Sequence, residues 1–465
     1  MPYYPCSCSQ WLRVPSILCL LLLGSIPLLC SAPSATASSS HAPRIGAVIA
    51  HATSMRWSGK LPPTYAACMA LPKDAHPCYS PQELQQAYGL TSLLQQGITG
   101  KGQNIVIIDS YGSPTALADL KHFDADYGLP DPPLFQQLSP IGTVPFNQRN
   151  SDQVGWEEET SLDIQWAHAM APQAGIIVLT SPVSETEGIA GMPEFLQLEQ
   201  YALDHHLGTI ISQSWSTAEN TLFTTAGEQQ VLTPFEQFYQ HAASAHISVF
   251  AASGDTGSAN VDVNNKTYPY PTVGYPAASP WVTAVGGTSL FVDAQGKYQY
   301  EKVWNDNTSA SGGGISQHFA EPSYQKDHLP SSVQALLKNH RGLPDVSMNA
   351  DPHTAVPVYM SFAAEPGYTL IGGTSESAPL WCGLTALANQ YSGHALGFLN
   401  PDLYRLGSDS QTAHEVFHDI VGGNNSAEKI PGYPATPGWN AATGWGTPIG
   451  GAFLQAIEKE EQHTK

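Results

Sequence analysis

Five short apolar runs alternate with segments of helical periodicity between residues 81 and 390. The runs are apolar at nearly every position, as expected for parallel strands covered on both faces. They lie at residues 104–109, 174–180, 208–213, 247–252 and 282–286. Helical patterns lie at about 157–170, 193–206 and 233–245, and a further helix is expected from about Ser375 to Gln390. The alternation predicts an α/β fold with a doubly wound, mostly parallel sheet, helices on both faces and a crevice at the strand ends.

The N-terminal region departs from this pattern. An apolar run at residues 16–29 follows Arg13 and precedes the small residues 34–37. A charged start, a short apolar run and small residues at the end are typical of a secretory signal peptide, cleaved here after about Ala37. The run is too short to favour a membrane span. A lipoprotein signal ending at Cys30 is the alternative, but Leu29 stands where a small residue is required.

We therefore expect three parts along the chain. Residues 1–37 are the signal peptide, residues 38–80 are a loosely structured extension rich in Ser, Ala, Pro and Thr, and residues 81–465 form the main domain. Export also permits disulfides, and Cys68 and Cys78 are close enough in sequence to form one. The expected protein is secreted, with no attachment to a membrane after signal cleavage.

The net charge of the chain excludes some classes of binding partner. The chain of 465 residues carries 39 acidic and 18 basic side chains, a net charge of -21. Such a surface repels nucleic acid and anionic lipid, so neither is an expected partner. Carboxylates with few basic partners become largely neutral at about pH 4 and below. The composition therefore suits an acidic habitat.

The segment GGTSESAP at residues 372–379 places a serine where a helix begins. Two glycines permit a sharp turn, and the backbone N–H of Ser375, aided by the helix dipole, would face a developing oxyanion. The alternative is that Thr374 or Ser375 is only an N-cap.

Two carboxylates share one face of the helix expected over residues 157–170. Glu159 and Asp163 are four residues apart, so their side chains project together. Two adjacent carboxyl groups cannot both ionise easily and can share a proton, which gives a base that works in acid. The alternative is an acidic helical turn that complements the helix dipole, and we accept it for Glu157 and Glu158.

Asp255 follows the apolar run 247–252 within the sequence SGDTGS. The end of that strand opens on the expected crevice, so the carboxyl group would lie at its mouth. An aspartate flanked by glycines can also serve only as an Asx-turn residue.

In combination, these segments resemble the sedolisins, secreted serine-carboxyl peptidases with a subtilisin-like fold. GGTSESAP resembles the nucleophile motif of that family, ETSLDIQWAHAMAP its Glu-x-x-x-Asp helix and SGDTGS its oxyanion loop. Further matches are ISQSW, SGGGIS and RGLPDVSMNADP, and the motifs occur in the family's order over about residues 78–450. The resemblance implies Ser375 as nucleophile, Glu159 as base, Asp163 as its orienting partner and Asp255 as oxyanion donor. It also implies a monomer that acts on protein or peptide substrates at acidic pH.

The resemblance further implies one calcium ion near the C-terminus. The corresponding ligands are the Asp419 side chain, the carbonyls of Ile420, Thr436 and Gly438, and the side chain of Asn440. The family has a second Asp where this chain has Asn440, so we expect weakened affinity.

Three alternatives compete with this interpretation. A subtilisin-type triad could use Asp109, but it also needs a histidine, typically in His-Gly-Thr, and no histidine here is followed by glycine. A glycosidase could use two carboxylates, but Glu159 and Asp163 on one helical turn would not flank a sugar ring. A catalytically inactive, secreted binding protein remains open because residues 38–80 are too few for the folded prodomain usual in the family.

Overall fold

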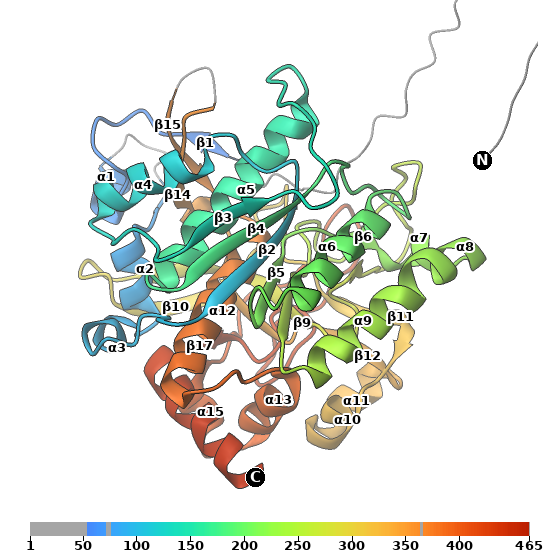
Figure 1. The fold of residues 1–465 in the computed structure, drawn as a ribbon. Coiled ribbons are helices and arrows are strands. Elements are labelled where there is room, and N and C mark those ends of the chain that lie inside the picture. The colour runs from blue at the N-terminus through green and yellow to red at the C-terminus, as the bar shows by residue number, and fades with distance from the viewer. Residues whose placement is uncertain (1–53, 71–75, 363–365, 465) are drawn as a thin grey trace, which may run out of the picture. The chain divides into compact units, whose positions relative to one another are not determined.

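The computed structural model describes residues 54–70, 76–362 and 366–464 (Figure 1). The chain divides into residues 1–44 and 45–465, and all described residues belong to the second unit. The predicted signal peptide lies outside the described residues. Among the helices that are described, none is long and apolar enough to cross a membrane.

An eight-stranded sheet forms the centre of the described unit. Its strand order is β10-β9-β7-β5-β2-β4-β3, and β13 pairs with β9 beside that path. Every pair is parallel except β9 with β10. The strands are β2 (Asn104–Ser110), β3 (Phe135–Leu138), β4 (Gly175–Ser181), β5 (Ile210–Gln213), β7 (Ser248–Ala252), β9 (Thr283–Val292), β10 (Tyr298–Val303) and β13 (Val346–Asn349). The expected α/β fold with a mostly parallel sheet is confirmed. The five expected strands correspond to β2, β4, β5, β7 and the first half of β9, which form the middle of the sheet.

Helices cover both faces of this sheet. Helices α5 (Ser151–Met170) and α12 (Thr374–Ser392) pack on one face, while α6 (Met192–Asp204) and α9 (Thr233–Ser244) pack on the other. The side chains of β2 alternate between the two cores: Ile105 and Ile107 join the core under α5 and α12. Because side chains alternate along a strand, Asp109 points to the same side, toward α5.

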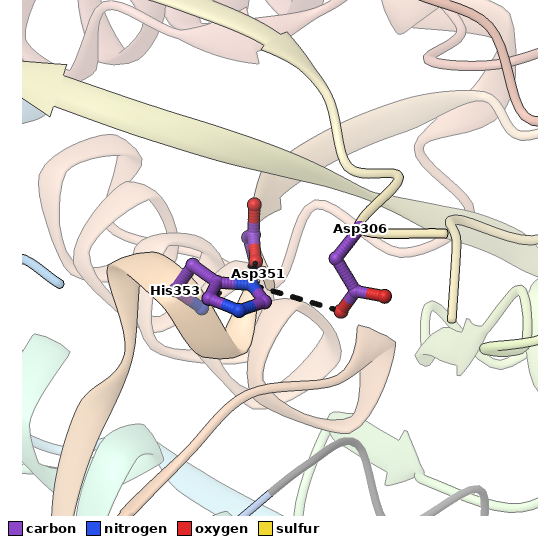
Figure 2. Close-up of side chains that lie close together, drawn as sticks. All are labelled: Asp306, Asp351 and His353. Carbon is purple, nitrogen blue, oxygen red and sulfur yellow. Dashed lines mark hydrogen bonds and ion pairs between the residues drawn. The ribbon is translucent and has the colours of Figure 1, made fainter. Parts of the chain in front are cut away.

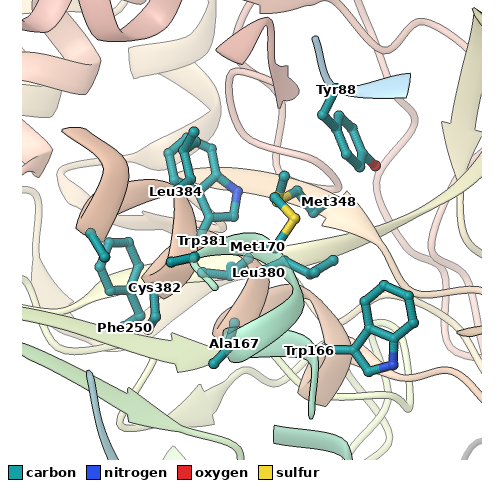
Figure 3. Close-up of a cluster of buried hydrophobic side chains, with 14 of the residues drawn as sticks. Tyr88, Trp166, Ala167, Met170, Phe250, Met348, Leu380, Trp381, Cys382 and Leu384 are labelled. Atoms are coloured by element: carbon teal, nitrogen blue, oxygen red, sulfur yellow. The ribbon is translucent and has the colours of Figure 1, made fainter. Parts of the chain in front are cut away.

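Helices α5 and α12 approach each other closely. A Cβ atom on Gly383 of α12 would lie 2.4 Å from the Cβ of Met170 on α5, a distance that forces one helix to move. Figure 3 shows Ala167 and Met170 of α5 gathered with Leu380 of α12 in the same buried cluster. This packing fixes the start of α12 relative to the middle of α5, where the predicted site residues lie.

Part of the N-terminal extension has regular structure, which differs from the expectation for residues 38–80. Strand β1 (Met55–Arg56) pairs with β15 (Gly367–Ile371), which also pairs with β14 (Val356–Met360). Helix α1 (Tyr65–Met69) follows, and a disulfide joins Cys68 to Cys78. Pairing with β15 and the covalent link order this segment despite its composition.

The remaining elements surround this framework. The helices are α2 (Pro81–Ala87), α3 (Thr91–Gln95), α4 (Ala116–Tyr127), α7 (Glu219–Leu222), α8 (Thr225–Gly227), α10 (Ser323–His328), α11 (Ser331–Leu337), α13 (Asn400–Ser408), α14 (Ala413–Val416) and α15 (Gly450–Thr464). Short antiparallel pairs are β6 (Thr217–Ala218) with β8 (Gly274–Tyr275), β11 (Gly314–Ala320) with β12 (His340–Leu343), and β16 (Phe417–His418) with β17 (Thr447–Pro448). Single turns of π and 3-10 helix lie at Glu228–Leu232 and Pro352–Thr354.

Candidate active site

The four predicted catalytic residues come together where α12 begins. Glu159 and Asp163 lie on α5, Ser375 is the second residue of α12, and Asp255 follows β7. Ser375 is half-buried, whereas the three carboxyl groups are buried. The site therefore combines one accessible hydroxyl with several desolvated acids.

Glu159 and Asp163 lie four residues apart on α5, and their carboxyl groups interact. Burial is the main cause that raises the pKa of each above its usual range, and the charge of Asp109 raises both further. A hydrogen bond with the side chain of Ser375 favours the ionised form of Glu159 and so lowers its pKa. The charge of Glu159 also raises the pKa of Asp163, because two neighbouring carboxyl groups do not both ionise easily.

Asp109 stands beside this pair as a third carboxyl group. It is the penultimate residue of β2, on the side that faces α5, and burial raises its pKa to about 7. A subtilisin-type triad would require a histidine beside Asp109. The side chains that shift the pKa of Glu159 are instead those of Ser375, Asp109, Asp255 and Ser214. The geometry therefore gives Asp109 a supporting position beside the carboxyl pair.

A proline inside α12 frees the backbone carbonyl of the nucleophile candidate. Pro379 has no N–H to donate to the carbonyl of Ser375 four residues earlier. The hydroxyl of Ser214, just after β5, lies 3.4 Å from that carbonyl oxygen and 2.9 Å from Asp163 Oδ1. Ser214 thus links the carboxyl pair to the backbone of Ser375. Sequence reasoning recorded the ISQSW segment but did not give Ser214 a role, although its place at a strand end could have suggested one.

Asp255 is held by the residue that precedes Ser375. The backbone N–H and the hydroxyl of Thr374 donate to Asp255 Oδ1 at 2.8 and 2.7 Å, and the N–H of Gly254 donates to the Thr374 hydroxyl at 3.0 Å. Burial raises the pKa of Asp255 to about 7 despite these hydrogen bonds. With both donors on Oδ1, a proton on this acid resides on Oδ2, where it is available to a ligand.

The turn into α12 requires glycine at position 373. Gly373 has φ +138°, and a Cβ atom there would lie 2.8 Å from Asp255 Oδ2. It is also the N-cap of α12, and no side chain forms a capping hydrogen bond. The alternative that Thr374 or Ser375 serves only as an N-cap therefore does not describe this helix.

Asp306, Asp351 and His353 form a group of possible cation ligands (Figure 2). His353 Nδ1 lies 3.1 Å from Asp351 Oδ1 and 3.8 Å from Asp306 Oδ2. The other oxygen of Asp306 accepts hydrogen bonds from two backbone N–H groups at 2.7 and 2.8 Å. The three side chains therefore lie close enough to interact directly with one another. The effect of this group on the site is electrostatic, because the charge of Asp306 raises the pKa of Asp255.

The expected calcium ligands meet in the loop after β16, but their hydrogen bonds do not fit a cation. The carbonyl oxygens of Ile420, Thr436 and Gly438 converge on the side chain of Asn440. The atom that faces them is Nδ2, a donor without a lone pair, while both oxygens of Asp419 accept the N–H of Gly438 at 3.1 Å. The hydrogen bonds of this set therefore do not favour the expected calcium ion.

Comparison with known proteins agrees with the fold and the arrangement of the site. Residues 142–419, more than half of the chain, match the model of the subtilase family. Kumamolisin from Bacillus sp. (strain MN-32) is 36% identical over 385 residues, which cover 82% of this chain and 63% of kumamolisin. Sedolisin from Pseudomonas sp. (strain 101) is 28% identical over 358 residues, which cover 75% of this chain and 56% of sedolisin. The chain thus spans less than two thirds of the length of these relatives.

Comparison with a solved structure supports the same relationship. Pseudomonas sedolisin, a serine-carboxyl proteinase complexed with two molecules of pseudo-iodotyrostatin, superimposes with a TM-score of 0.69 at 27% identity, covering 83% of this chain and 99% of that structure. The fold is therefore subtilisin-like. The chain belongs to the subtilase family and, within it, to the sedolisins.

Proposed function

We propose that this chain is a serine-carboxyl peptidase that hydrolyses peptide bonds of protein or peptide substrates at acidic pH. The observation that carries the proposal is the buried pair Glu159 and Asp163 beside the half-buried Ser375, with Asp255 held by the adjacent Thr374. A histidine base would be protonated in acid, whereas a carboxyl pair that shares one proton still accepts a second. The arrangement suits nucleophilic catalysis at low pH.

The four residues have distinct roles in the proposed reaction. Ser375 Oγ attacks the carbonyl carbon of the substrate while Glu159 takes the hydroxyl proton, and Asp163 orients Glu159 and keeps the proton that the pair already shares. The carbonyl π electrons move to oxygen, and this oxyanion accepts a hydrogen bond from protonated Asp255. Glu159 then protonates the leaving amine as the C–N bond breaks. Water, deprotonated by Glu159, hydrolyses the acyl-enzyme and restores Ser375.

The localisation and the partners of the proposed enzyme are inferred from the sequence. We infer secretion, because residues 1–37 have the pattern of a signal peptide, and a monomeric enzyme whose partners are its substrates. The negative net charge of -21 argues against nucleic acid as a partner. No step of the proposed reaction uses a metal ion.

Peptide hydrolysis by matched variants tests this function. The full chain would be incubated with denatured casein from about pH 2 to about pH 8, with the products identified by mass spectrometry. Ser375→Ala and Glu159→Gln should each lower turnover by about 10³-fold or more, because members of a catalytic group act as a unit. Glu158→Gln changes the neighbouring helical position and should keep most activity. Near-normal turnover of Ser375→Ala, or equal losses in Glu159→Gln and Glu158→Gln, would contradict the proposal.

A further inference from the structure

Asn440 places a hydrogen-bond donor at the point where three backbone carbonyls converge. Its Nδ2 atom lies 3.2 Å from the carbonyl oxygen of Thr436, 3.4 Å from that of Gly438 and 3.5 Å from that of Ile420. The residue is buried, with 4% of its surface exposed. Three inward-facing carbonyls without a donor or a cation would be costly to bury, and here the amide supplies the donor.

The opposite end of the same amide fixes its orientation. Asn440 Oδ1 accepts the backbone N–H groups of Ala442 at 3.1 Å and Thr443 at 3.0 Å, and the Thr443 hydroxyl at 3.1 Å. If the amide turned over, its NH₂ group would face two N–H donors and its oxygen would face three carbonyl oxygens. Both ends would then be mismatched, so the hydrogen-bond pattern allows one orientation only.

We propose that the amide of Asn440 replaces a cation in this loop, so that the fold is stable without calcium. Calcium binds oxygen lone pairs, and Nδ2 offers none. To bind the ion through Oδ1, Asn440 would have to give up its three hydrogen bonds from Ala442 and Thr443. The hydrogen bonds of the Asn440 amide are neutral, and neither a chelator nor acid removes them.

A single substitution should convert this loop into a calcium site. In Asn440→Asp, one carboxylate oxygen can keep the N–H groups of Ala442 and Thr443, while the other lies against the three carbonyl oxygens. That contact is repulsive unless a cation stands between them. Together with Asp419, the set would then contain two carboxylates and three carbonyls, which are the ligands that calcium prefers.

Thermal unfolding of the full chain tests the proposal. The melting temperatures of the wild type and of Asn440→Asp are measured in millimolar EDTA, calcium or magnesium. The wild type should melt at the same temperature in all three. Asn440→Asp should melt at least about 2–3 °C lower than the wild type in EDTA, and calcium should restore this loss better than magnesium, which demands a stricter geometry. Asn440→Ala, which lacks both donor and acceptor, should be destabilised equally with and without calcium.

Calcium content provides a readout that does not depend on the variants at position 440. Wild-type protein purified without chelator should contain no stoichiometric calcium. Asp419→Asn, which removes a carboxylate from the expected ligand set, should therefore have the same calcium content as the wild type. The proposal is overturned if the wild type carries such an ion, or if calcium raises its melting temperature and Asp419→Asn abolishes that rise. A melting temperature of Asn440→Asp that is indifferent to calcium would also overturn it.

Discussion

Thr374 donates two hydrogen bonds to a single oxygen of Asp255, from its backbone N–H at 2.8 Å and its hydroxyl at 2.7 Å. The second oxygen, Oδ2, lies next to the turn that precedes Ser375, where only glycine leaves room. Hydrogen bonds to an ionised carboxylate lower its pKa, and burial opposes them. Burial prevails, and the pKa of Asp255 is raised to about 7.

Replacing Thr374 should move the alkaline limit of activity. The proposed reaction needs a protonated Asp255, so activity should fall as pH rises through its pKa of about 7. Thr374→Val removes one hydrogen bond that favours the ionised form, so the pKa of Asp255 rises and the alkaline limit moves to higher pH. Thr374→Ser keeps the hydroxyl and should leave the limit in place. The measurement is the pH profile of kcat/KM for a synthetic peptide.

Variants of Asp255 itself control this prediction. Asp255→Asn supplies a donor that does not titrate, so it should retain part of the activity and lose the alkaline limit due to Asp255. Asp255→Ala should lose about 2.7–4 kcal/mol of transition-state stabilisation, the scale of one oxyanion donor. An unchanged alkaline limit in both Thr374→Val and Asp255→Asn would assign that limit to another group.

The sequence predicted the strands and helices that position the site because they are buried and regular. Central strands such as β2 are apolar at successive positions, and this pattern needs no tertiary information. Edge strands were not predicted: β3 has the sequence FQQL and is only partly buried. Helix α5 begins at Ser151, six residues before the prediction, because Asn150 caps it by accepting the N–H of Asp152 at 3.1 Å.

The earlier start of α5 also changes the interpretation of Glu157. This residue lies in the second turn of the helix, not the first, and its side chain is fully buried. An acidic first turn that complements the helix dipole is therefore the wrong description of Glu157. The sequence could place Glu159 and Asp163 on one face from helical spacing alone. It could not show the contact of Ser214 with Asp163, which are distant along the chain. It also could not show the direction of the Asn440 amide, which depends on how the loop folds around that side chain.

Ser214 should act as a positioning residue for the carboxyl pair. Its hydroxyl hydrogen bonds favour the ionised forms of Glu159 and Asp163, so Ser214→Ala should raise the pKa of the pair. The acid limit of activity then moves to higher pH, by up to about one unit, with a fall in kcat. Ser212→Ala, two residues earlier on the same face of β5, is the matched control and should leave the acid limit unchanged. A fall in kcat with no shift of the acid limit would leave Ser214 only a packing role.

Glu157 should make the stability of the fold depend on pH. Burial is the main cause that raises its pKa from 4.5 to about 8, and the charge of Asp119 adds to it. Because the folded state holds this proton more tightly than the unfolded chain, the stabilisation is complete below about pH 4.5 and is lost as pH rises through about 8. Glu157→Gln keeps the shape and cannot ionise. Its melting temperature should equal that of the wild type at about pH 4 and exceed it by about 2–4 °C at about pH 8. Glu415→Gln, an exposed change on α14, should follow the wild type at both values. If Glu157→Gln differs from the wild type by the same amount at both pH values, the buried side chain is not the titrating group.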